Sequence, residues 1–347
     1  MPQGNDHAGF HEPNPVLQQH IQLLASLPNV VISTESVTNL SVPSDSTIDG
    51  YLRFSRKKQK LTPRITHHVR GSNRFRMIKL SSENIPHILI GISTNGPPAR
   101  HVQVHTLHIP MDAKTFFDQL QPAEIKANSL PSSYAHQWYQ REEKAAQIHD
   151  NYLQHIPWCD LKAFSMLMPA LPAGSRLQLG NSTPIRYAQL FRYTQVDRTD
   201  ANRGTSGIDG CTSTAMGAAS TFDGITTLIV GDNSFLYDSN ALWIKNCSPS
   251  LRIIVIQNGG GGIFRFLEGP SGLEEVEEYF ETPHNVDIER LVEVHRFKVY
   301  RATDAPSLES ALSEFYQPGQ QAAVLIIQTP EKINGKILKG YFQTLKN

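Results

Sequence analysis

The chain has 347 residues, of which 39% are hydrophobic and 18% are charged. This length and composition are typical of a globular protein with two compact domains, and they exclude a coiled coil, a collagen and a disordered tail. The 32 basic residues balance the 32 acidic ones. The net charge therefore does not favour a nucleic acid or an anionic membrane as partner, although it leaves a local basic patch open.

The cysteines and the N-terminus indicate the compartment. Cys159, Cys211 and Cys247 form an odd, sparse set without a CxxC spacing, which predicts neither a disulfide framework nor a thiolate zinc site. The N-terminal residues lack the cationic start and the apolar run of a secretion signal. The longest apolar stretch, residues 164–173, is interrupted by two prolines. We therefore expect a cytoplasmic protein that does not span a membrane.

The first 121 residues are predicted to form a small α/β domain. The pattern VLQQHIQLLASL after Pro15 predicts an amphipathic helix, and NVVIST after it predicts a buried strand. A basic stretch follows, with ten lysines or arginines and no acid between Asp49 and Glu83. Such a stretch with interleaved phenylalanines is compatible with phosphate binding, but a solvated face is the interpretation we prefer.

Three histidines in HVQVHTLHIP, His101, His105 and His108, have no acidic or thiol companion at a metal-ligand spacing, so they predict no metal site. A polar segment from Pro122 to Ser133 predicts a linker, and a helix is expected from about Tyr134 to His155. The predicted organisation is therefore a central α/β domain (1–121, divergent over 50–104), a linker with a leading helix (122–145), and a second domain (146–347).

Helical and extended patterns alternate from residue 161 to the C-terminus. The apolar strings RLQL, TTLIVG, LRIIVIQ, RFKVYRA and AAVLIIQT predict strands, and LKAFSMLM, TPIRYAQLF, DSNALWIKN and LESALSEFY predict helices. This alternation predicts an α/β fold with an open, mostly parallel sheet flanked by helices. With the smaller N-terminal domain, the chain is expected to contain two such sheets.

Four polar or glycine-rich strings follow predicted strands or join them: GNS at 180–182, NRGTSGIDG at 202–210, GDNS at 231–234 and NGGGG at 258–262. Ligands of open α/β sheets bind outside the carboxyl ends of the strands. The four strings are therefore expected to meet at one edge of the sheet and to form the ligand site there.

Two of these strings carry ligands suited to a hard divalent cation. Asp232 follows the strand TTLIVG, and Asn258 follows the strand LRIIVIQ. A carboxylate, an amide oxygen and a backbone carbonyl freed by the glycines, for instance that of Gly260, are the oxygen ligands that magnesium prefers, and they leave positions for a diphosphate. The alternative is that Asp232 caps the next helix and the glycines form a flexible loop.

The strings GDNSFLYDSNAL, NGGGGIF, NRGTSGIDG and GNSTPIR resemble the thiamin-diphosphate domain of the 2-succinyl-5-enolpyruvyl-6-hydroxy-3-cyclohexene-1-carboxylate synthase (MenD) family of menaquinone biosynthesis. The resemblance runs from about Tyr134 to the C-terminus and includes YFETPHNVDIERLVEVHRFKVYRA. A general thiamin-enzyme signature, a GDG with a later asparagine pair, would indicate the superfamily alone. The additional strings favour this member of it.

The resemblance implies a role for individual residues. Mg²⁺ or Mn²⁺ would be bound by Asp232, Asn258 and the carbonyl of Gly260. The cofactor would be bound by the residues Asn181, Ser234, Gly259, Gly261 and Gly262. Ile208 matches the bulky apolar residue that holds the cofactor bent, although an ordinary core isoleucine is the alternative. The implied substrate contacts are Ser182, Arg186, Arg203 and Phe264; two arginines suit dianionic substrates, and a surface ion pair is their alternative.

The resemblance also implies the reaction and the assembly. The family decarboxylates 2-oxoglutarate and adds the resulting four-carbon unit to isochorismate, in a homodimer or homotetramer whose sites are shared between subunits. Its N-terminal pyrimidine-binding domain, with the glutamate that activates the cofactor, has no counterpart in this sequence. The family's substrate-binding lysine is not assignable among Arg56, Lys57 and Lys58. The basic 50–104 stretch matches the family poorly, as a divergent insertion or a disturbed reading frame would.

Two other functions remain compatible with these residues. One is a different thiamin-diphosphate 2-oxo-acid decarboxylase or synthase, which would not need both Arg186 and Arg203. The other is a non-catalytic module that retains the diphosphate cleft, which the missing glutamate favours and the intact GDNS and NGGGG strings oppose.

Overall fold

The structure is a computed structural model that describes residues 13–27, 39, 65–69, 88–92, 107–109, 111, 113–119, 134–203, 205–265 and 275–345. Its contacts divide the chain into two compact units, residues 151–341 and residues 1–150 with 342–347. The two units are described separately below.

The N-terminal unit begins with helix α1 (Pro15–Ala25), as the apolar pattern predicts. The side chain of Asn14 accepts hydrogen bonds from the N–H groups of Val16 and Leu17, so it caps the helix, and Pro15 occupies the first turn. The helix buries Leu17, Ile21 and Ala25, which lie one turn apart on one face. The strand predicted at NVVIST lies outside the described residues.

A three-stranded parallel sheet follows, with the order β1 (Ile65–Val69), β2 (Ile88–Ile92) and β3 (Leu107–Ile109). Helix α4 (Ala113–Gln119) contacts α1, and the Nε2 atom of His20 lies 3.2 Å from Oδ1 of Asp118. The ten basic residues between Asp49 and Glu83 lie outside the described residues. Two of these parallel strands, β1 and β2, lie inside the 50–104 stretch that was expected to be divergent.

The C-terminal unit contains one six-stranded sheet whose order is β5-β4-β6-β7-β9-β8, and all of its neighbouring strands are parallel. The fold is α/β, as predicted, although the sequence analysis expected a mostly parallel sheet. The strands are β4 (Arg176–Leu179), β5 (Arg198–Ala201), β6 (Thr226–Gly231), β7 (Leu251–Gln257), β8 (Lys298–Ala302) and β9 (Ala323–Gln328). The alternation did not predict β5, because this edge strand is short and polar.

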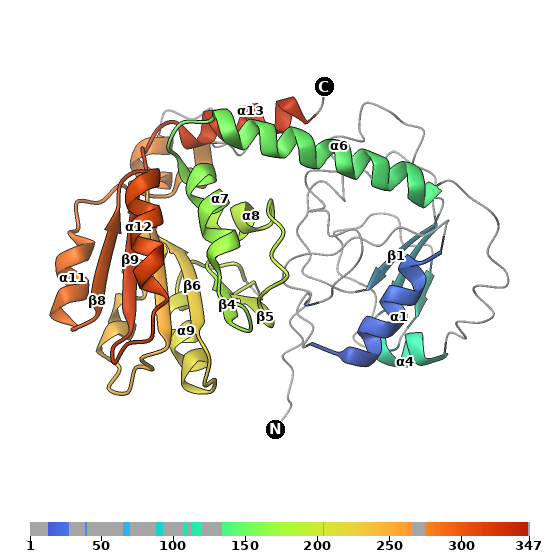
Figure 1. The fold of residues 1–347 in the computed structure, drawn as a ribbon, viewed down its shortest axis with the longest axis horizontal. Helices are drawn as coiled ribbons and strands as arrows, with labels where there is room; N and C mark the ends of the chain where they lie inside the picture. Colours follow the sequence, from blue (N-terminus) through green and yellow to red (C-terminus); the bar gives the residue numbers. More distant parts are fainter. Residues whose placement is uncertain are drawn as a thin grey trace. The chain divides into compact units, whose positions relative to one another are not determined.

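Helices cover both faces of this sheet (Figure 1). Helix α7 contacts α8 and α12, whereas α9, α10 and α11 contribute to a core on the opposite face. The long helix α6 has the predicted bounds (Tyr134–His155). The remaining helices are α7 (Asp160–Ala170), α8 (Thr183–Ala188), α9 (Cys211–Ser220), α10 (Asp232–Tyr237), α11 (Ile288–Val294), α12 (Ala305–Phe315) and α13 (Asn334–Thr344). None of the described helices has the length and apolarity needed to cross a bilayer.

The helix predicted at DSNALWIKN is wrong in type, since the segment forms a short 3₁₀ helix, η2 (Ser239–Trp243). The carboxylate of Asp238 accepts hydrogen bonds from the N–H and the hydroxyl of Ser213 in α9. This contact fixes Asp238, the residue between α10 and η2. Only a short connector follows it, and short connectors are a common place for 3₁₀ turns. Two further short elements are η3 (Gly262–Arg265) and the π-helix η5 (Val276–Phe280).

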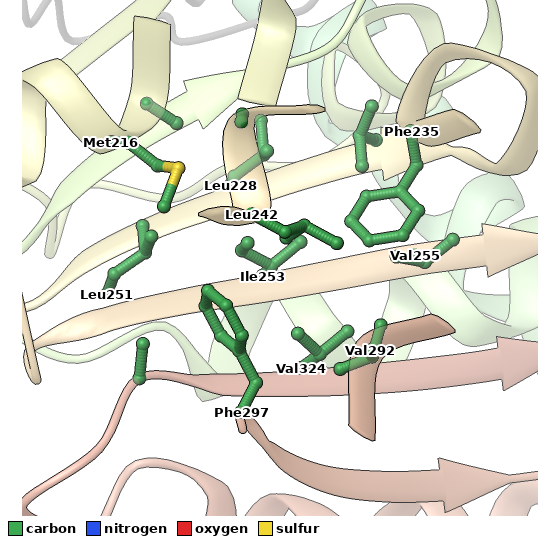
Figure 2. Close-up of a cluster of buried hydrophobic side chains, with 14 of the residues drawn as sticks. Met216, Leu228, Phe235, Leu242, Leu251, Ile253, Val255, Val292, Phe297 and Val324 are labelled. Atoms are coloured by element: carbon green, nitrogen blue, oxygen red, sulfur yellow. The ribbon is translucent and has the colours of Figure 1, made fainter. Parts of the chain in front are cut away.

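The strands β6, β7 and β9 form the centre of the core because both of their faces are covered. Leu251, Ile253 and Val255 point into a cluster that also contains Phe297 and Met216 (Figure 2). Ile254 and Ile256 alternate with these residues and are equally buried, on the face of α7 and α12. Continuous apolar runs are characteristic of parallel strands of this kind.

The substitution Ile253→Ala should destabilise the C-terminal unit by about 2–5 kcal/mol, because it leaves a cavity in a fully buried layer. The matched control is Ile244→Ala, since that side chain is 47% exposed and its loss should change the free energy of unfolding by less than about 0.5 kcal/mol. Urea unfolding followed by circular dichroism would compare the two. Similar losses in both variants would contradict the assignment of this core.

Candidate functional site

The topology of the sheet places its ligand-binding edge between β4 and β6. The chain passes from β4 to β5 on one side and then returns to β6 on the other side, which makes this gap a topological switch point. Residues 180–182, Asn202, Asp232 and Asn258 follow the carboxyl ends of β4, β5, β6 and β7. The predicted gathering of the four strings at one edge is therefore confirmed.

The carboxylate of Asp232 connects two of these strings. Its Oδ1 atom accepts a hydrogen bond from the N–H of Asn233 at 2.8 Å. Its Oδ2 atom accepts from the N–H groups of Asn258 (3.1 Å), Gly259 (2.9 Å) and Gly260 (3.1 Å). Helix α10 begins at Asp232, and Gly231 rather than Asp232 is its N-cap residue. The side chain joins the end of β6 to the loop after β7.

This loop requires glycine where the segment after η5 approaches it. Gly260 has a φ of 132°, and a Cβ atom there would lie 2.4 Å from the carbonyl oxygen of Glu281. The same carbonyl accepts a hydrogen bond from the N–H of Gly261 at 2.6 Å and from Nδ2 of Asn233 at 2.9 Å. A side chain at Gly260 would therefore separate two segments that meet at Asp232.

The same segment brings a histidine to the carboxylate. Nε2 of His284 lies 3.6 Å from Oδ2 of Asp232, a distance that belongs to an ion pair rather than a hydrogen bond. The interaction with Asp232 raises the pKa of His284, which favours the imidazolium form next to the carboxylate. The sequence analysis did not select His284, because a lone histidine in TPHNVD forms no pattern with Asp232.

A second buried carboxylate, Asp160, was also missed. It is the first residue of α7 and is 1% exposed; its Oδ1 accepts from the hydroxyl of Thr329 at 2.6 Å and its Oδ2 from Nδ2 of Asn258 at 2.8 Å. Burial, assisted by the repulsion of Asp232, raises the pKa of Asp160 to about 6, although its two hydrogen bonds oppose the shift. No sequence signal identifies Asp160, since an acid in the first turn of a helix is common.

The predicted residue Asn181 fixes the loop after β5. It is buried, its Nδ2 donates to the carbonyls of Asn202 (2.5 Å) and Gly207 (2.6 Å), and its Oδ1 accepts from Arg203 at 3.0 Å. Ser182 has a φ of 71°, and its carbonyl accepts a hydrogen bond from Arg186 at 2.5 Å. Both predicted arginines therefore meet residues of the GNS string.

Ser234 fixes the loop that carries Ile208. The Ser234 hydroxyl donates to the Ile208 carbonyl at 2.5 Å, and the contact of Asp238 with Ser213 holds the helix that follows. Ile208 is half-buried, unlike the fully buried isoleucines of the core. Phe264 is also half-buried, and its ring centroid lies 5.4 Å from that of Phe280.

The carboxylate of Asp232, the side-chain amide of Asn258 and the carbonyl of Gly260 are oxygen groups of the kind that a hard divalent cation prefers, and the three residues meet where the N–H groups of Asn258 and Gly260 donate to Asp232. The residues that the structure describes contain no group of three or more His, Cys, Asp or Glu that could hold a metal ion. The loop N–H groups are already bonded within the protein: Gly259 and Gly260 to Asp232, Gly261 to Glu281, and Gly262 to Gly260. This internal bonding holds the loop in one conformation.

Comparison with known proteins finds one matching domain model and several relatives. Residues 180–327 match the model of the thiamine pyrophosphate enzyme C-terminal TPP binding domain. The 2-succinyl-5-enolpyruvyl-6-hydroxy-3-cyclohexene-1-carboxylate synthase of Porphyromonas gingivalis is 35% identical over 345 residues, and that of Flavobacterium psychrophilum is 36% identical over 354. The chain is a homologue of these synthases. The protein of the same name from Christiangramia forsetii is 41% identical over 204 residues.

The similarity to these synthases covers more of the chain than the region from Tyr134 onward, where the sequence motifs resemble the family. The alignments cover 96% and 97% of the chain with the first two relatives, and therefore include the N-terminal unit as well as the region from Tyr134 onward. They cover 59% and 61% of the relatives, so the chain spans about three fifths of their length. The Christiangramia alignment covers 59% of the chain and 35% of the relative.

The substitution Gly260→Ala should lower the melting temperature of this synthase homologue, because the new Cβ would meet the Glu281 carbonyl and φ is positive there. The matched control is Gly217→Ala in α9, where the new Cβ would have no neighbour within 4 Å. It should stabilise the fold by about 0.5–1 kcal/mol. Thermal unfolding of both variants would test this, and an unchanged melting temperature for Gly260→Ala would contradict the close approach.

Proposed function

We propose that the chain forms the metal- and thiamin-diphosphate-binding part of a synthase that decarboxylates 2-oxoglutarate and adds the remaining four-carbon unit to isochorismate. The observation that carries this proposal is the contact of Asp232 with the N–H groups of Asn258 and Gly260, at the switch-point edge of a domain that matches the thiamine pyrophosphate enzymes. Residues 146–347 would form this binding domain and residues 1–121 the central α/β domain, joined by 122–145.

The metal, Mg²⁺ or Mn²⁺, would be held by Asp232, the amide oxygen of Asn258 and the carbonyl of Gly260. The metal held by these oxygens would offset the negative charge of a diphosphate and orient it. The diphosphate itself would lie against Ser234 and the glycines of the loop, Gly259, Gly261 and Gly262, with Asn181 behind it. When bound, the cofactor supplies the electron sink for decarboxylation.

Ile208 would support the cofactor from below. Its side chain is half-buried, and its backbone carbonyl is held by the Ser234 hydroxyl. An apolar side chain on a fixed backbone can maintain a bent conformation of the cofactor at little further entropic cost. Ser234 would therefore act on the cofactor both directly and through Ile208.

Arg186 and Arg203 would bind the carboxylates of the substrates. Each guanidinium already donates a hydrogen bond to the GNS string, to the Ser182 carbonyl and to the Asn181 side chain respectively. These contacts restrict the rotamers of both side chains, and the planar guanidinium is the group best suited to bind a carboxylate with two parallel hydrogen bonds. Phe264 would form an apolar wall that excludes water, and Ser182 would supply a polar contact.

Turnover would require more of the protein than the described site. The family's activating glutamate belongs to the pyrimidine-binding domain, and no acid of this chain matches its motif. We propose that this group is supplied by a pyrimidine-binding domain from outside these 347 residues, and that the assembly is a homodimer or homotetramer. Small-molecule substrates, and neither a nucleic acid nor a membrane, are the proposed partners.

The substitution Asp232→Ala should abolish magnesium-dependent binding of thiamin diphosphate, because it removes the only carboxylate proposed to bind the metal. Asp223→Ala is the control, since Asp223 is exposed in the turn before β6. Calorimetric titration of each protein with thiamin diphosphate, with and without Mg²⁺, measures the effect.

In the wild type, binding of the cofactor without turnover of 2-oxoglutarate and isochorismate supports the proposal, because the activating glutamate is expected from elsewhere. Turnover would show that an acid of this chain replaces that glutamate. Wild-type binding that persists in Asp232→Ala would overturn the metal assignment.

The substitution Arg203→Ala should weaken 2-oxoglutarate binding to the cofactor-loaded protein by about 10- to 100-fold, as expected for the loss of charge-assisted hydrogen bonds. Binding of 2-oxobutanoate, which lacks the second carboxylate, should change much less. The control is Arg290→Ala, whose side chain is 85% exposed. Calorimetry with both acids separates the outcomes, and an equal loss for the two would contradict a dicarboxylate clamp.

A further inference from the structure

Three neighbouring strands end in polar residues that lie in one row at the edge of the sheet. Asp232, Asn258 and Thr329 are the first residues after β6, β7 and β9. The register pairs Gln257 with Gln328, so Asn258 and Thr329 lie opposite each other, and it pairs Gly231 with Ile256, so Asn258 lies one residue beyond the position opposite Asp232. The N–H of Thr329 donates to the carbonyl of Gln257 at 3.0 Å, which extends the ladder by one bond.

Asp160 reaches into this row from α7. One carboxylate oxygen accepts from Nδ2 of Asn258 at 2.8 Å and the other from the hydroxyl of Thr329 at 2.6 Å. The backbone N–H of Asp160 donates to Oδ1 of Asn334 at 2.9 Å, and the Nδ2 of Asn334 donates to the Pro330 carbonyl. Both ends of the residue are therefore fixed.

Helix capping does not explain this side chain. Asp160 lies at the first helical position, after Cys159, and its carboxylate bonds to side chains of other elements rather than to N–H groups of α7. It has no cationic partner among the residues that the structure describes. A buried carboxylate without a cation costs stability compared with an apolar residue. Stability therefore does not explain why an aspartate lies here, and its two hydrogen bonds point to a role in orienting their donors.

The carboxylate of Asp160 decides which end of the Asn258 side-chain amide, its oxygen or its nitrogen, faces it. The amide of asparagine has nearly the same shape at its oxygen and its nitrogen, so a hydroxyl or amide neighbour would accept either orientation. An ionised carboxylate only accepts hydrogen bonds, and it therefore selects the orientation in which Nδ2 faces Asp160. In that orientation Oδ1 is the end of the amide that is not bonded to Asp160.

We propose that Asp160 is a positioning residue for the metal site: with Thr329, it holds the amide of Asn258 so that its oxygen, and not its nitrogen, is presented to the divalent cation. This inference rests on the proposed function, because it requires Asn258 to be a metal ligand. Outer carboxylates that orient metal ligands through hydrogen bonds commonly change metal affinity 10- to 100-fold when they are replaced.

The test measures Mn²⁺ binding to the full chain in the presence of saturating thiamin diphosphate, from the electron paramagnetic resonance signal of free Mn²⁺. Asn258→Ala should weaken Mn²⁺ binding and thereby test the ligand itself. Asp160→Asn keeps the size of the side chain but can present either a donor or an acceptor, and it should raise the Kd for Mn²⁺ by about 10-fold.

The matched control is Asp238→Asn, which alters another buried carboxylate that accepts hydrogen bonds from a neighbouring helix, at Ser213. It should leave the Kd for Mn²⁺ unchanged even if it lowers the melting temperature of the metal-free protein. A purely structural role of Asp160 predicts the same behaviour for Asp160→Asn, so melting temperature and Kd together separate the two roles.

The outcomes distinguish this inference from the proposed function. Unchanged Mn²⁺ binding in Asn258→Ala overturns the metal assignment itself. A weakened Asn258→Ala with an unchanged Asp160→Asn overturns the positioning role alone. If Asp160→Asn does not fold, Thr329→Val and Thr329→Ser replace it: the valine variant should raise the Kd several-fold and the serine variant should restore it, and equal values would refute the proposal.

Discussion

The carboxylate of Asp232 is the interaction on which the rest of the site depends. It lies buried at the end of β6 and accepts four N–H groups, one from its own helix and three from the loop after β7. A buried charge is tolerated when its oxygens are satisfied by donors, and three successive amides can converge on one oxygen only where the backbone takes the conformations of Gly259 and Gly260. The charge and the glycines therefore require each other.

The surrounding polar residues extend this arrangement from strand to strand. Asn181 anchors the loop that contains Arg203, Ser234 anchors the backbone of Ile208, and Asp160 connects Asn258 to Thr329. Each contact joins the ends of different elements, so the loops are held by side chains rather than by a regular ladder. Groups fixed before a ligand arrives need little reorganisation when it binds, which is the usual basis of electrostatic preorganisation.

The fold of this chain does not by itself determine which reaction it supports. A parallel sheet with a switch point provides an edge where loops can gather, but many unrelated functions use that edge. The homology to the synthases of Porphyromonas and Flavobacterium covers nearly the whole chain and about three fifths of each relative. The site described here therefore explains how a metal and a diphosphate would be held, and the remaining chemistry belongs to the proposal for the whole protein.

Much of the C-terminal unit could be predicted from the sequence, because its central strands are buried on both faces and produce unbroken apolar runs such as LRIIVIQ. The edge strand β5 and the 3₁₀ helix η2 could not, since both are short and owe their conformation to neighbours, Asp238 among them. The resemblance likewise indicated Asp232, Asn258 and Gly260 from strings that are local in the sequence.

Asp160 and His284 had no such signal. They reach Asn258 and Asp232 from 98 and 52 positions away in the chain, and no local pattern links residues that approach only when separate elements pack. The sequence by itself determined the apolar strands, the glycines of the loop after β7 and the polar residues that follow each strand, because these depend on local chemistry. The tertiary structure alone decided which carboxylate meets which amide, because hydrogen bonds between elements depend on the register and packing of the whole sheet.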